Sequence, residues 1–387
     1  CVITSPPYWG LRKYTDSEAW GLEPDWRDWM QRMLAWGAEC KRVLKKSGTM
    51  WLNCGESYAG SWGNYGAREG RQRSKNTERI IRAGYEVVGW DGKPPSVKPH
   101  GFRPKDLIML PARLAIALHD EQGWYIRNDI VWTKTNHMPS SVKDRLANSW
   151  EHVFLMTRSP RYYFALDKVR RPHAPISIVR NKTGTVNYSN PDDPRAMQFQ
   201  QPQGLLHVNG ANPGDFLEPD ILRGPTAQQH VVPGVTRNFA VFPEYLAAFC
   251  LSAGCPEQVC VTCGTARENI VKTISHYTKR EPSHVPNNEP TKVDSSGWRP
   301  SEMQSVGYMS CACGDRDGYE PGLVLDSFAG SGTTLAVAAR MGLRAIGIEI
   351  SSAYNSAAQE RIERAILERQ HGAADADLIE AGQGLLL

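Results

Sequence analysis

The chain has 387 residues, 41% of them hydrophobic and 22% charged, a composition typical of a globular protein and not of a disordered one. Its 45 Lys and Arg against 41 Asp and Glu give a formal net charge of +4, which permits a polyanionic partner without requiring one. No run of 18 apolar residues occurs, which excludes a membrane-spanning helix, and nine cysteines without an export signal favour a reduced, cytoplasmic protein.

The N-terminal residues predict a short strand that runs into a rigid turn. Cys1 to Thr4 form an apolar run without the features of a signal peptide, and since the chain does not begin with Met we expect that an upstream piece is missing. Two prolines in the turn fix an extended backbone and leave carbonyl oxygens that can only accept hydrogen bonds. A hydroxyl, such a carbonyl and an aromatic ring suit a planar group with an exocyclic amine; the alternative is a polar turn with a packed ring. The turn consists of Ser5, Pro6, Pro7 and Tyr8.

The next elements alternate between helix and strand. Apolar residues at helical spacing predict a helix from about Pro24 to Lys45, with Asp25 as its N-cap. A buried strand follows at residues 49–53, then a helix from about residue 104 to 119 and one or two strands at residues 124–132.

Two long segments are rich in loop-forming and basic residues. Residues 58–100 carry eight Lys or Arg against four acidic residues, which fits a solvated surface loop or a loop that closes over a nucleic-acid backbone. Within the loop-rich region 135–237, residues 158–182 carry seven Lys or Arg and one Asp, interleaved with Tyr162, Tyr163 and Phe164. Such a mixture suits phosphate contact and base packing, and it is also common in ordinary irregular domains.

The strongest pattern lies near the C-terminus. Leu323 to Asp326 predicts a buried strand, and a glycine turn then leads into a helix that Thr333 and Thr334 open, with its first backbone amides facing a ligand. Residues 345–349 predict a second strand that ends in Glu349, an acid well placed to accept hydrogen bonds from ribose hydroxyls. The spacing is not Gly-x-Gly-x-x-Gly, so a nicotinamide cofactor is disfavoured. After a further helix to about Glu368, the tail reads as low-complexity and frayed.

Together these motifs resemble the β class of amino-directed DNA methyltransferases, in which the catalytic motif precedes the cofactor motif. The family's (Asp/Asn/Ser)-Pro-Pro-(Tyr/Phe) motif is matched by residues 5–8, and its Phe-x-Gly-x-Gly motif by residues 328–332. Residues 242–244 resemble the family's cofactor-side motif, and residues 129–136 resemble the segment that leads into target recognition. The resemblance implies an α/β fold with the doubly wound, mixed, Rossmann-like sheet of S-adenosylmethionine-dependent methyltransferases.

The resemblance also implies an activity and a set of site residues. The enzyme would transfer a methyl group from S-adenosylmethionine to the exocyclic amine of a base flipped out of double-stranded DNA. A motif that begins with Ser5 leans toward N4 of cytosine, with N6 of adenine as the alternative, and the acidic turn that contacts the cofactor's adenine would lie upstream of Cys1. The catalytic residues would be Ser5, Pro6, Pro7 and Tyr8, and the cofactor residues Asp326, Phe328, Gly330, Gly332, Thr333, Thr334, Glu349, Phe242, Pro243 and Glu244.

Four cysteines flank the segment 258–318. Cys260 and Cys263 form a C-x-x-C-Gly motif of the zinc-knuckle type, and Cys311 and Cys313 form a less standard C-x-C-Gly motif. Four thiolates predict a closed structural Zn²⁺ site without an open position for catalysis; the alternative is a set of unpaired cysteines. The segment resembles small zinc-ribbon insertions of phage-type methyltransferases, and we expect the metal to staple an insertion that lacks a core.

These assignments divide the chain into a catalytic half of the core, a basic loop, two core continuations around a target-recognition region, a zinc-binding insertion, a cofactor-binding half and a tail. Two other interpretations stay open: an amide or small-amine methyltransferase, and a catalytically inactive zinc-ribbon DNA-binding protein. The expected partner is double-stranded DNA; the sequence leaves open both the existence of a cognate restriction endonuclease and the oligomeric state. In the order of the chain, the segments are 1–57, 58–100, 101–134, 135–237, 238–257, 258–318, 319–368 and 369–387.

Overall fold

The computed structural model gives the chain as two compact units. The first comprises Cys1–Phe164, Gly214–Glu257 and Pro321–Leu387, and the second Ala165–Pro213 and Gln258–Glu320. Within the described part of the chain, no helix is both long and apolar enough to cross a membrane. The structure describes residues 1–10, 20–21, 23, 25–59, 101–103, 105–134, 142–174, 176–178, 206–207, 209–217, 243–267, 269–274, 302–309, 311–314 and 318–380.

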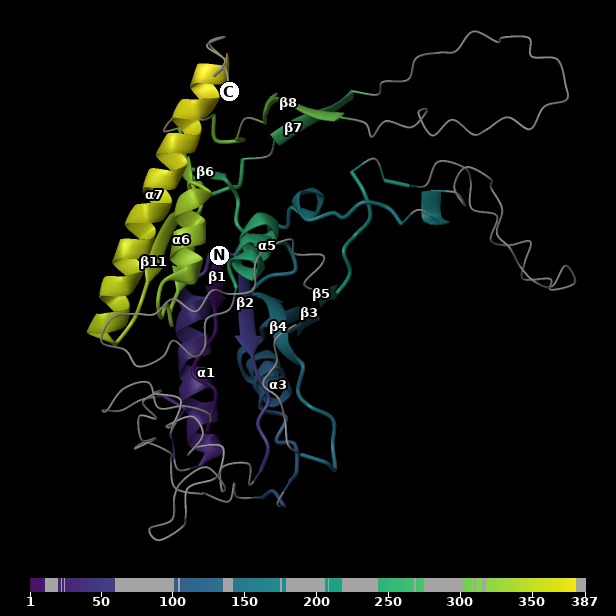
Figure 1. The fold of residues 1–387 in the computed structure, drawn as a ribbon, viewed down its shortest axis with the longest axis vertical. Coiled ribbons are helices and arrows are strands. Elements are labelled where there is room, and N and C mark those ends of the chain that lie inside the picture. The colour runs from purple at the N-terminus through teal and green to yellow at the C-terminus, as the bar shows by residue number, and fades with distance from the viewer. Residues whose placement is uncertain are drawn as a thin grey trace, which may run out of the picture. The chain divides into compact units, whose positions relative to one another are not determined.

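The first unit is built on a seven-stranded sheet with the order β11-β10-β1-β2-β4-β3-β5 (Figure 1). β1 pairs in parallel with both β10 and β2, and β10 pairs in parallel with β11, whereas β4 is antiparallel to β2 and to β3. The predicted mixed sheet is therefore confirmed. Its strands are β1 (Val2–Thr4), β2 (Thr49–Cys54), β3 (Tyr125–Thr133), β4 (Trp150–Thr157), β5 (Phe216–Leu217), β10 (Leu323–Asp326) and β11 (Arg344–Gly347).

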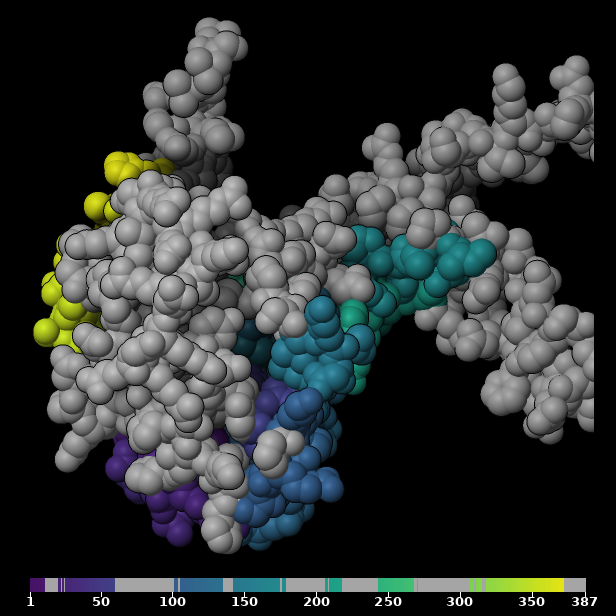
Figure 2. Space-filling view, turned by 60° about the horizontal axis from the view of Figure 1, so that its bottom comes forward, coloured from purple at the N-terminus to yellow at the C-terminus, as the bar shows by residue number. Residues whose placement is uncertain are grey.

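Helices cover both faces of this sheet: α1 (Trp26–Val43), α3 (Leu110–Gln122), α5 (Glu244–Gly254), α6 (Thr333–Arg340) and α7 (Ser352–Glu380). On β2, Met50 and Leu52 belong to the apolar cluster formed with α1 and α3, while Trp51 packs against Phe249 of α5 with ring centroids 6.4 Å apart. Because successive strand residues point to opposite faces, α1 and α3 lie on one face and α5 on the other. α6 packs against α5 and α7, and Figure 2 shows the α1 and α3 regions side by side.

The predicted helix after residue 24 is confirmed as α1. Asp25 is its N-cap, and the Asp25 carboxylate accepts a hydrogen bond of 2.8 Å from the backbone N–H of Arg27. The predicted strands at residues 49–53 and 124–132 are also confirmed, the second as the single strand β3.

Two predicted helix ends were wrong. α3 begins at Leu110 and not near residue 104, because Pro111 suits the first helical turn and Met109 before it has a left-handed φ of 57°. α7 continues to Glu380, beyond its predicted end at about Glu368, through a segment rich in alanine, the strongest helix former.

The second unit contains only short elements in its described residues. β7 (Asn269–Ile274) and β8 (Glu302–Tyr308) form an antiparallel hairpin, β6 (Gln258–Cys260) pairs with β9 (Tyr319–Pro321), and Leu166–Lys168 form a 3₁₀ turn. The basic loop expected at 58–100 lies outside the described residues from residue 60 on, as does much of the region 135–237.

A buried histidine joins the ends of three neighbouring strands. His152 Nδ1 of β4 lies 2.8 Å from Asp129 Oδ1 of β3, and its Nε2 lies 3.6 Å from Glu56 Oε1, just after β2. The ring also stacks on Phe154, with centroids 5.3 Å apart. Burial alone would lower the pKa of His152, but the two carboxylates outweigh it and raise the pKa to about 9. The imidazole is therefore a cation at neutral pH.

We expect this cation to make stability depend on pH. Since the folded-state pKa is raised from 6.5 to about 9, its contribution to the free energy of unfolding is fully present below pH 6.5 and is lost as pH rises through about 9. In urea denaturation, His152→Gln should lower the free energy of unfolding by about 1–3 kcal/mol just below pH 6.5 and by much less above about pH 9.5. The exposed His119→Gln should match the wild type at both pH values. An equal loss of unfolding free energy in His152→Gln at both pH values would contradict a stabilising charge on His152.

Candidate active site and cofactor site

The predicted catalytic and cofactor segments meet at one edge of the sheet. Because β1, β2, β10 and β11 are parallel, their carboxyl ends share this edge. The chain passes from β10 through α6 to β11 in one direction and from β1 through α1 to β2 in the other, so the winding of the sheet reverses between β10 and β1. Such a switch point is where open α/β sheets bind their ligands.

Asp326 ties the two segments together at this point. Its Oδ1 accepts hydrogen bonds from Thr4 Oγ1 at 2.7 Å and from the backbone N–H of Phe328 at 3.2 Å, and its Oδ2 accepts one from Thr334 Oγ1 at 2.6 Å. The carboxylate is 2% exposed, and this burial raises its pKa against the effect of the three donors. Asp326 thus fixes the shape of the turn, and any contribution to cofactor binding would pass through that shape.

The glycine turn after β10 is held open by Glu349. Gly330 and Gly332 have left-handed φ angles of 51° and 77°, as a turn this tight requires. Glu349 accepts hydrogen bonds from the backbone N–H groups of Gly330 at 2.8 Å and Ser351 at 2.9 Å, and each oxygen keeps a further lone pair. A Cβ at Gly330 would meet no described atom within 4 Å, whereas one at Gly332 would lie 2.7 Å from Ala358 Cβ. The first glycine therefore leaves room for a ligand, and the second allows α6 and α7 to pack.

Aromatic rings line the turn on its other side. Phe328 lies against Trp20 and Trp36, with ring centroids 5.3 and 5.9 Å apart, and Trp36 Nε1 donates a hydrogen bond to Ser327 Oγ at 2.8 Å. An aromatic and polar surface of this kind fits a nucleoside. The remaining lone pairs of Glu349, the open space beside Gly330 and the Phe328 ring together fit S-adenosylmethionine.

Two residues near the start of α6 and α5 are engaged by arginines. Thr333 Oγ1 accepts a hydrogen bond from Arg361 at 2.9 Å, and the Glu244 carboxylate pairs with both Arg340 and Arg361 at 2.5 Å. Burial would raise the pKa of Glu244, but the two guanidinium groups outweigh it and lower the pKa. Pro243 precedes α5 as its N-cap residue, while Phe242 lies outside the described residues.

The catalytic segment is held rigidly after β1. Pro7 O accepts a hydrogen bond from Trp29 Nε1 of α1 at 2.9 Å, so this carbonyl is already engaged. Pro6 is buried and Ser5 is partly exposed. A Cβ at Gly55 would lie 2.6 Å from Tyr8 Cε2, which shows that the Tyr8 ring packs directly on the backbone after β2.

The Tyr8 hydroxyl lies at the centre of a polar network. It is 3.1 Å from Ser5 Oγ, 3.0 Å from Asn53 Oδ1 and 2.9 Å from Glu151 Oε2. Asn53 Nδ2 also donates to Glu151 Oε2 at 3.1 Å, and Lys134 forms an ion pair with the other Glu151 oxygen. Burial and the Glu151 charge raise the pKa of Tyr8 well above its usual value, so the phenol stays neutral.

Three members of this network were not among the predicted site residues: Asn53, Lys134 and Glu151. Asn53 lies near the end of a strand parallel to β1, so its place at the same edge could have been predicted. Glu151 depends on the antiparallel pairing of β4 with β2, in which Asn53 faces Val153, and no local pattern signals that register.

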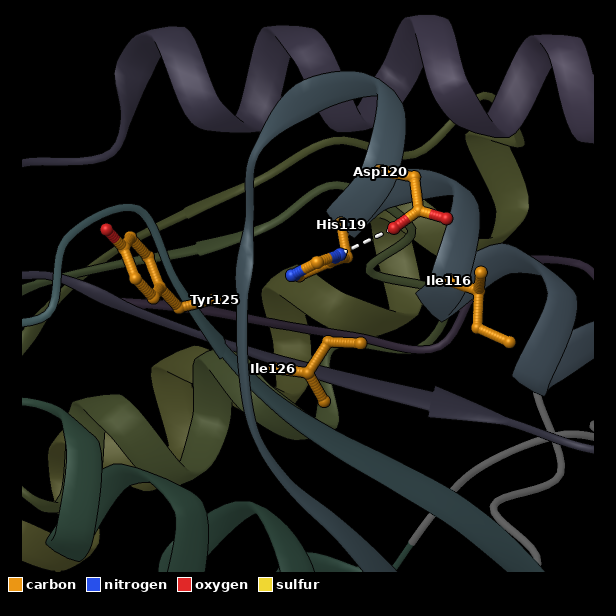
Figure 3. Close-up of a pocket in the computed structure, with 5 residues that line it drawn as sticks. All are labelled: Ile116, His119, Asp120, Tyr125 and Ile126. Carbon is orange, nitrogen blue, oxygen red and sulfur yellow. Dashed lines mark hydrogen bonds and ion pairs between the residues drawn. The ribbon is translucent and has the colours of Figure 1, made fainter.

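A surface hollow lies elsewhere in the first unit. A cavity of about 300 Å³ is lined by Ile116, His119, Asp120, Tyr125 and Ile126, with His119 Nδ1 2.7 Å from Asp120 Oδ1 (Figure 3). Tyr125 is level with Thr157 and hence with Thr49, at the amino end of β2. The hollow is therefore at the sheet edge opposite Ser5 and is separate from the candidate active site.

In the second unit, the structure brings together the cysteines predicted to bind metal. The Sγ atoms of Cys260, Cys263, Cys311 and Cys313 all lie within 4.8 Å of one another. Cys255, which is close in sequence, belongs to the first unit.

Comparison with known proteins places the chain among methylases. The family model described as DNA methylase, for the N6 and N4 group, matches residues 1–262 and 319–360. The interval that it leaves out contains three of the four clustered cysteines. The type II methyltransferase M.XycI of Xanthomonas campestris pv. cyanopsidis is 46% identical over 221 residues, which are 56% of this chain and 68% of that protein.

Two further similarities cover nearly the whole chain. The type II methyltransferase M.SmaI of Serratia marcescens is 30% identical over 365 residues, which are 94% of this chain and 84% of that protein. Among solved structures, the cytosine-N4-specific PvuII DNA methyltransferase matches 93% of this chain and 78% of its own at 15% identity, with a TM-score of 0.45. That structural likeness is distant, and the sequence matches carry the family assignment.

Proposed function

Because the chain belongs to the N6/N4 family of DNA methylases, which transfer a methyl group from S-adenosylmethionine to a base, we propose that it methylates N4 of cytosine in double-stranded DNA. The observation that carries this proposal is Ser5 at the first position of the catalytic motif, at the carboxyl end of β1. The hydrogen bond from Thr4 to Asp326 holds Ser5 beside the glycine turn after β10, where the cofactor is proposed to bind. N6 of adenine is the alternative acceptor.

The cofactor is proposed to bind over the turn after β10. Gly330 leaves space for it, Glu349 accepts from the ribose hydroxyls, and Phe328 supplies an apolar wall. When bound, S-adenosylmethionine would supply the sulfonium methyl: the amine nitrogen would bond to the methyl carbon as the carbon–sulfur bond breaks, S-adenosylhomocysteine would leave, and one proton would pass from the nitrogen to water. Asp326, Gly332, Thr333 and Thr334 shape the turn, and Pro243 and Glu244 place the first turn of α5 beside α6.

The flipped base is proposed to bind between Ser5 and Tyr8. The Ser5 hydroxyl and the Pro6 carbonyl hold the exocyclic amine, because the neighbouring Pro7 carbonyl is engaged by Trp29. The Tyr8 ring stacks on the base, and its contact with the backbone of Gly55 fixes the plane of stacking. Catalysis then consists mainly of aiming the nitrogen lone pair at the methyl carbon.

Glu151 acts in this scheme as a positioning residue. It anchors the Tyr8 hydroxyl and the Asn53 amide at once, and Lys134 balances its charge. A neutral phenol that is held by a carboxylate cannot swing out of the stacking plane without breaking a charge-assisted hydrogen bond.

DNA is proposed to be recognised by the region 135–237, whose basic and aromatic residues include Arg161 and Tyr162. Relatives bear the name of type II methyltransferases, so we further propose that a cognate restriction endonuclease recognises the same DNA sequence.

The proposed base is tested by incubating the protein with labelled S-adenosylmethionine and mixed-sequence duplex DNA, then identifying the labelled nucleoside by mass spectrometry. We expect label in N4-methylcytosine, and at least about a hundredfold less from Ser5→Ala, which loses the amine-holding hydroxyl. Label in N6-methyladenine would refute the choice of base. Label in neither base, with S-adenosylmethionine bound, would refute DNA as the substrate.

A second prediction concerns the cofactor turn. Gly330→Val should weaken S-adenosylmethionine binding at least about tenfold in equilibrium dialysis, because the side chain enters the space proposed for the cofactor. Gly214→Val is the matched control, since Gly214 also has a left-handed φ, of 79°, and open space at its Cβ. It should bind the cofactor as the wild type does. An equal loss in both variants would point to backbone strain alone.

A third prediction concerns Glu151. Glu151→Gln should lower the single-turnover methylation rate by about 10- to 100-fold with the S-adenosylmethionine affinity unchanged, because the Tyr8 ring loses its anchor. The pKa of Tyr8, followed by ultraviolet absorbance, should fall, since the Glu151 charge helps to raise it. Glu39→Gln, which removes an exposed ion pair on α1, should change neither quantity. A methylation rate within about twofold of wild type would contradict the positioning role.

A further inference from the structure

The four clustered cysteines have the spacing of a metal site. The Sγ–Sγ distances are 3.4 Å for Cys260–Cys313, 3.0 Å for Cys263–Cys311, 3.3 Å for Cys311–Cys313 and 3.9 Å for Cys263–Cys313. A disulfide would require about 2.05 Å. Four thiolates around one Zn²⁺ at about 2.3 Å stand about 3.8 Å apart, close to the observed set.

The backbone around the cysteines is shaped for these positions. Gly264 and Gly314 directly follow the two motifs with left-handed φ angles of 69° and 85°. Their N–H groups donate to Cys260 O at 2.8 Å and Cys311 O at 3.0 Å, which closes a tight turn at each motif. The backbone N–H of Cys311 donates to the Tyr319 hydroxyl at 2.9 Å, so an aromatic side chain braces the second motif.

Few apolar side chains of the cysteine-bearing unit are buried where the structure describes their exposure. Outside residues 269, 271–274 and 302–306, the buried apolar side chains among its described residues are those of Pro213, Val259 and Cys260. Arg267 lies over the rings of Tyr308 and Tyr319, at 4.5 and 4.1 Å from their centroids, in place of an apolar contact. Among these residues, apolar burial therefore offsets little of the conformational entropy that is lost on folding.

We infer that Cys260, Cys263, Cys311 and Cys313 bind one Zn²⁺ as thiolates, and that the ion stabilises the fold of the segment 258–320 in which they lie. Coordination joins the two motifs across residues 264–310, the segment that carries the β7–β8 hairpin, and so restricts the unfolded chain. All four positions of the ion are filled by sulfur, so its role is structural. The inference does not depend on which base the enzyme methylates.

Metal content is the first test, on the full-length protein purified from cells without added chelator. We expect about one zinc per chain by elemental analysis, and loss of it in Cys263→Ser and in Cys313→Ser. Cys1→Ser, at a cysteine outside the cluster, should keep the metal. An iron–tetrathiolate site absorbs visible light and a zinc site does not. Iron found in place of zinc would therefore refute the identity of the ion. A chain that folds with four reactive thiols and less than about one-tenth of a zinc would refute the site.

Removal of the metal tests the second half of the inference. An organic mercurial binds the thiolates and displaces zinc, and we expect this to make residues 258–320 sensitive to limited proteolysis. Removal of the mercurial with excess thiol, followed by added zinc, should protect these residues again. S-adenosylmethionine binding, measured on the same samples, should stay unchanged, because the cofactor turn belongs to the first unit with its own core. Proteolysis of residues 258–320 that is the same with and without zinc would refute the structural role, whatever the methylation activity.

Discussion

The hydrogen bond from Thr4 to Asp326 is the contact on which the geometry of the site depends. It joins side chains 322 positions apart in the sequence, one at the end of the strand that leads into Ser5 and the other at the end of the strand that leads into the glycine turn. A buried carboxyl group is costly unless hydrogen-bond partners surround it, and Asp326, which is 2% exposed, has two threonine hydroxyls and a backbone N–H as partners. The loss of any one of these three hydrogen bonds would therefore weaken the whole contact between the two strands. Methyl transfer depends on the relative position of donor and acceptor, and this one buried group fixes the two strands that carry the proposed cofactor and base sites.

A second carboxylate, Glu151 of β4, performs a similar task on the other side of β1 and β2. Glu151 anchors Tyr8 and Asn53, while Lys134 neutralises its charge. The two carboxylates differ in their surroundings: Asp326 receives only neutral donors, whereas Glu151 has a cation beside it. Replacing Asp326 would disturb the fold of the turn, but replacing Glu151 would loosen a single aromatic ring. The residue proposed to position the substrate can thus be separated from the residue that shapes the turn.

The parts of the site that the sequence could predict are those whose backbone is demanding locally. Consecutive prolines at Pro6 and Pro7, and left-handed glycines at Gly330 and Gly332, leave a signature in a few adjacent residues. Glu151 leaves none, because its place depends on how an antiparallel strand enters an otherwise parallel sheet.

Helix ends can be predicted from the sequence where a local capping signal marks them. Asp25 marks the start of α1. Pro111 marks the first turn of α3, which therefore begins later than the return of apolar periodicity predicts. The end of α7 has no such signal, because its alanine-rich last turns resemble a low-complexity tail in composition and yet favour the helix.

The two units embody different solutions to the same thermodynamic problem. The first buries large apolar side chains such as Trp29, Met33 and Leu118 around its sheet, so it can carry polar atoms at its edge without losing stability. In the second unit, among the residues whose exposure the structure describes, the buried apolar side chains are those of Pro213, Val259 and Cys260. A thiolate-bound ion would hold such a fold together with four side chains. The proposed zinc site is thus the counterpart, in the second unit, of the apolar cluster beneath the catalytic strand in the first.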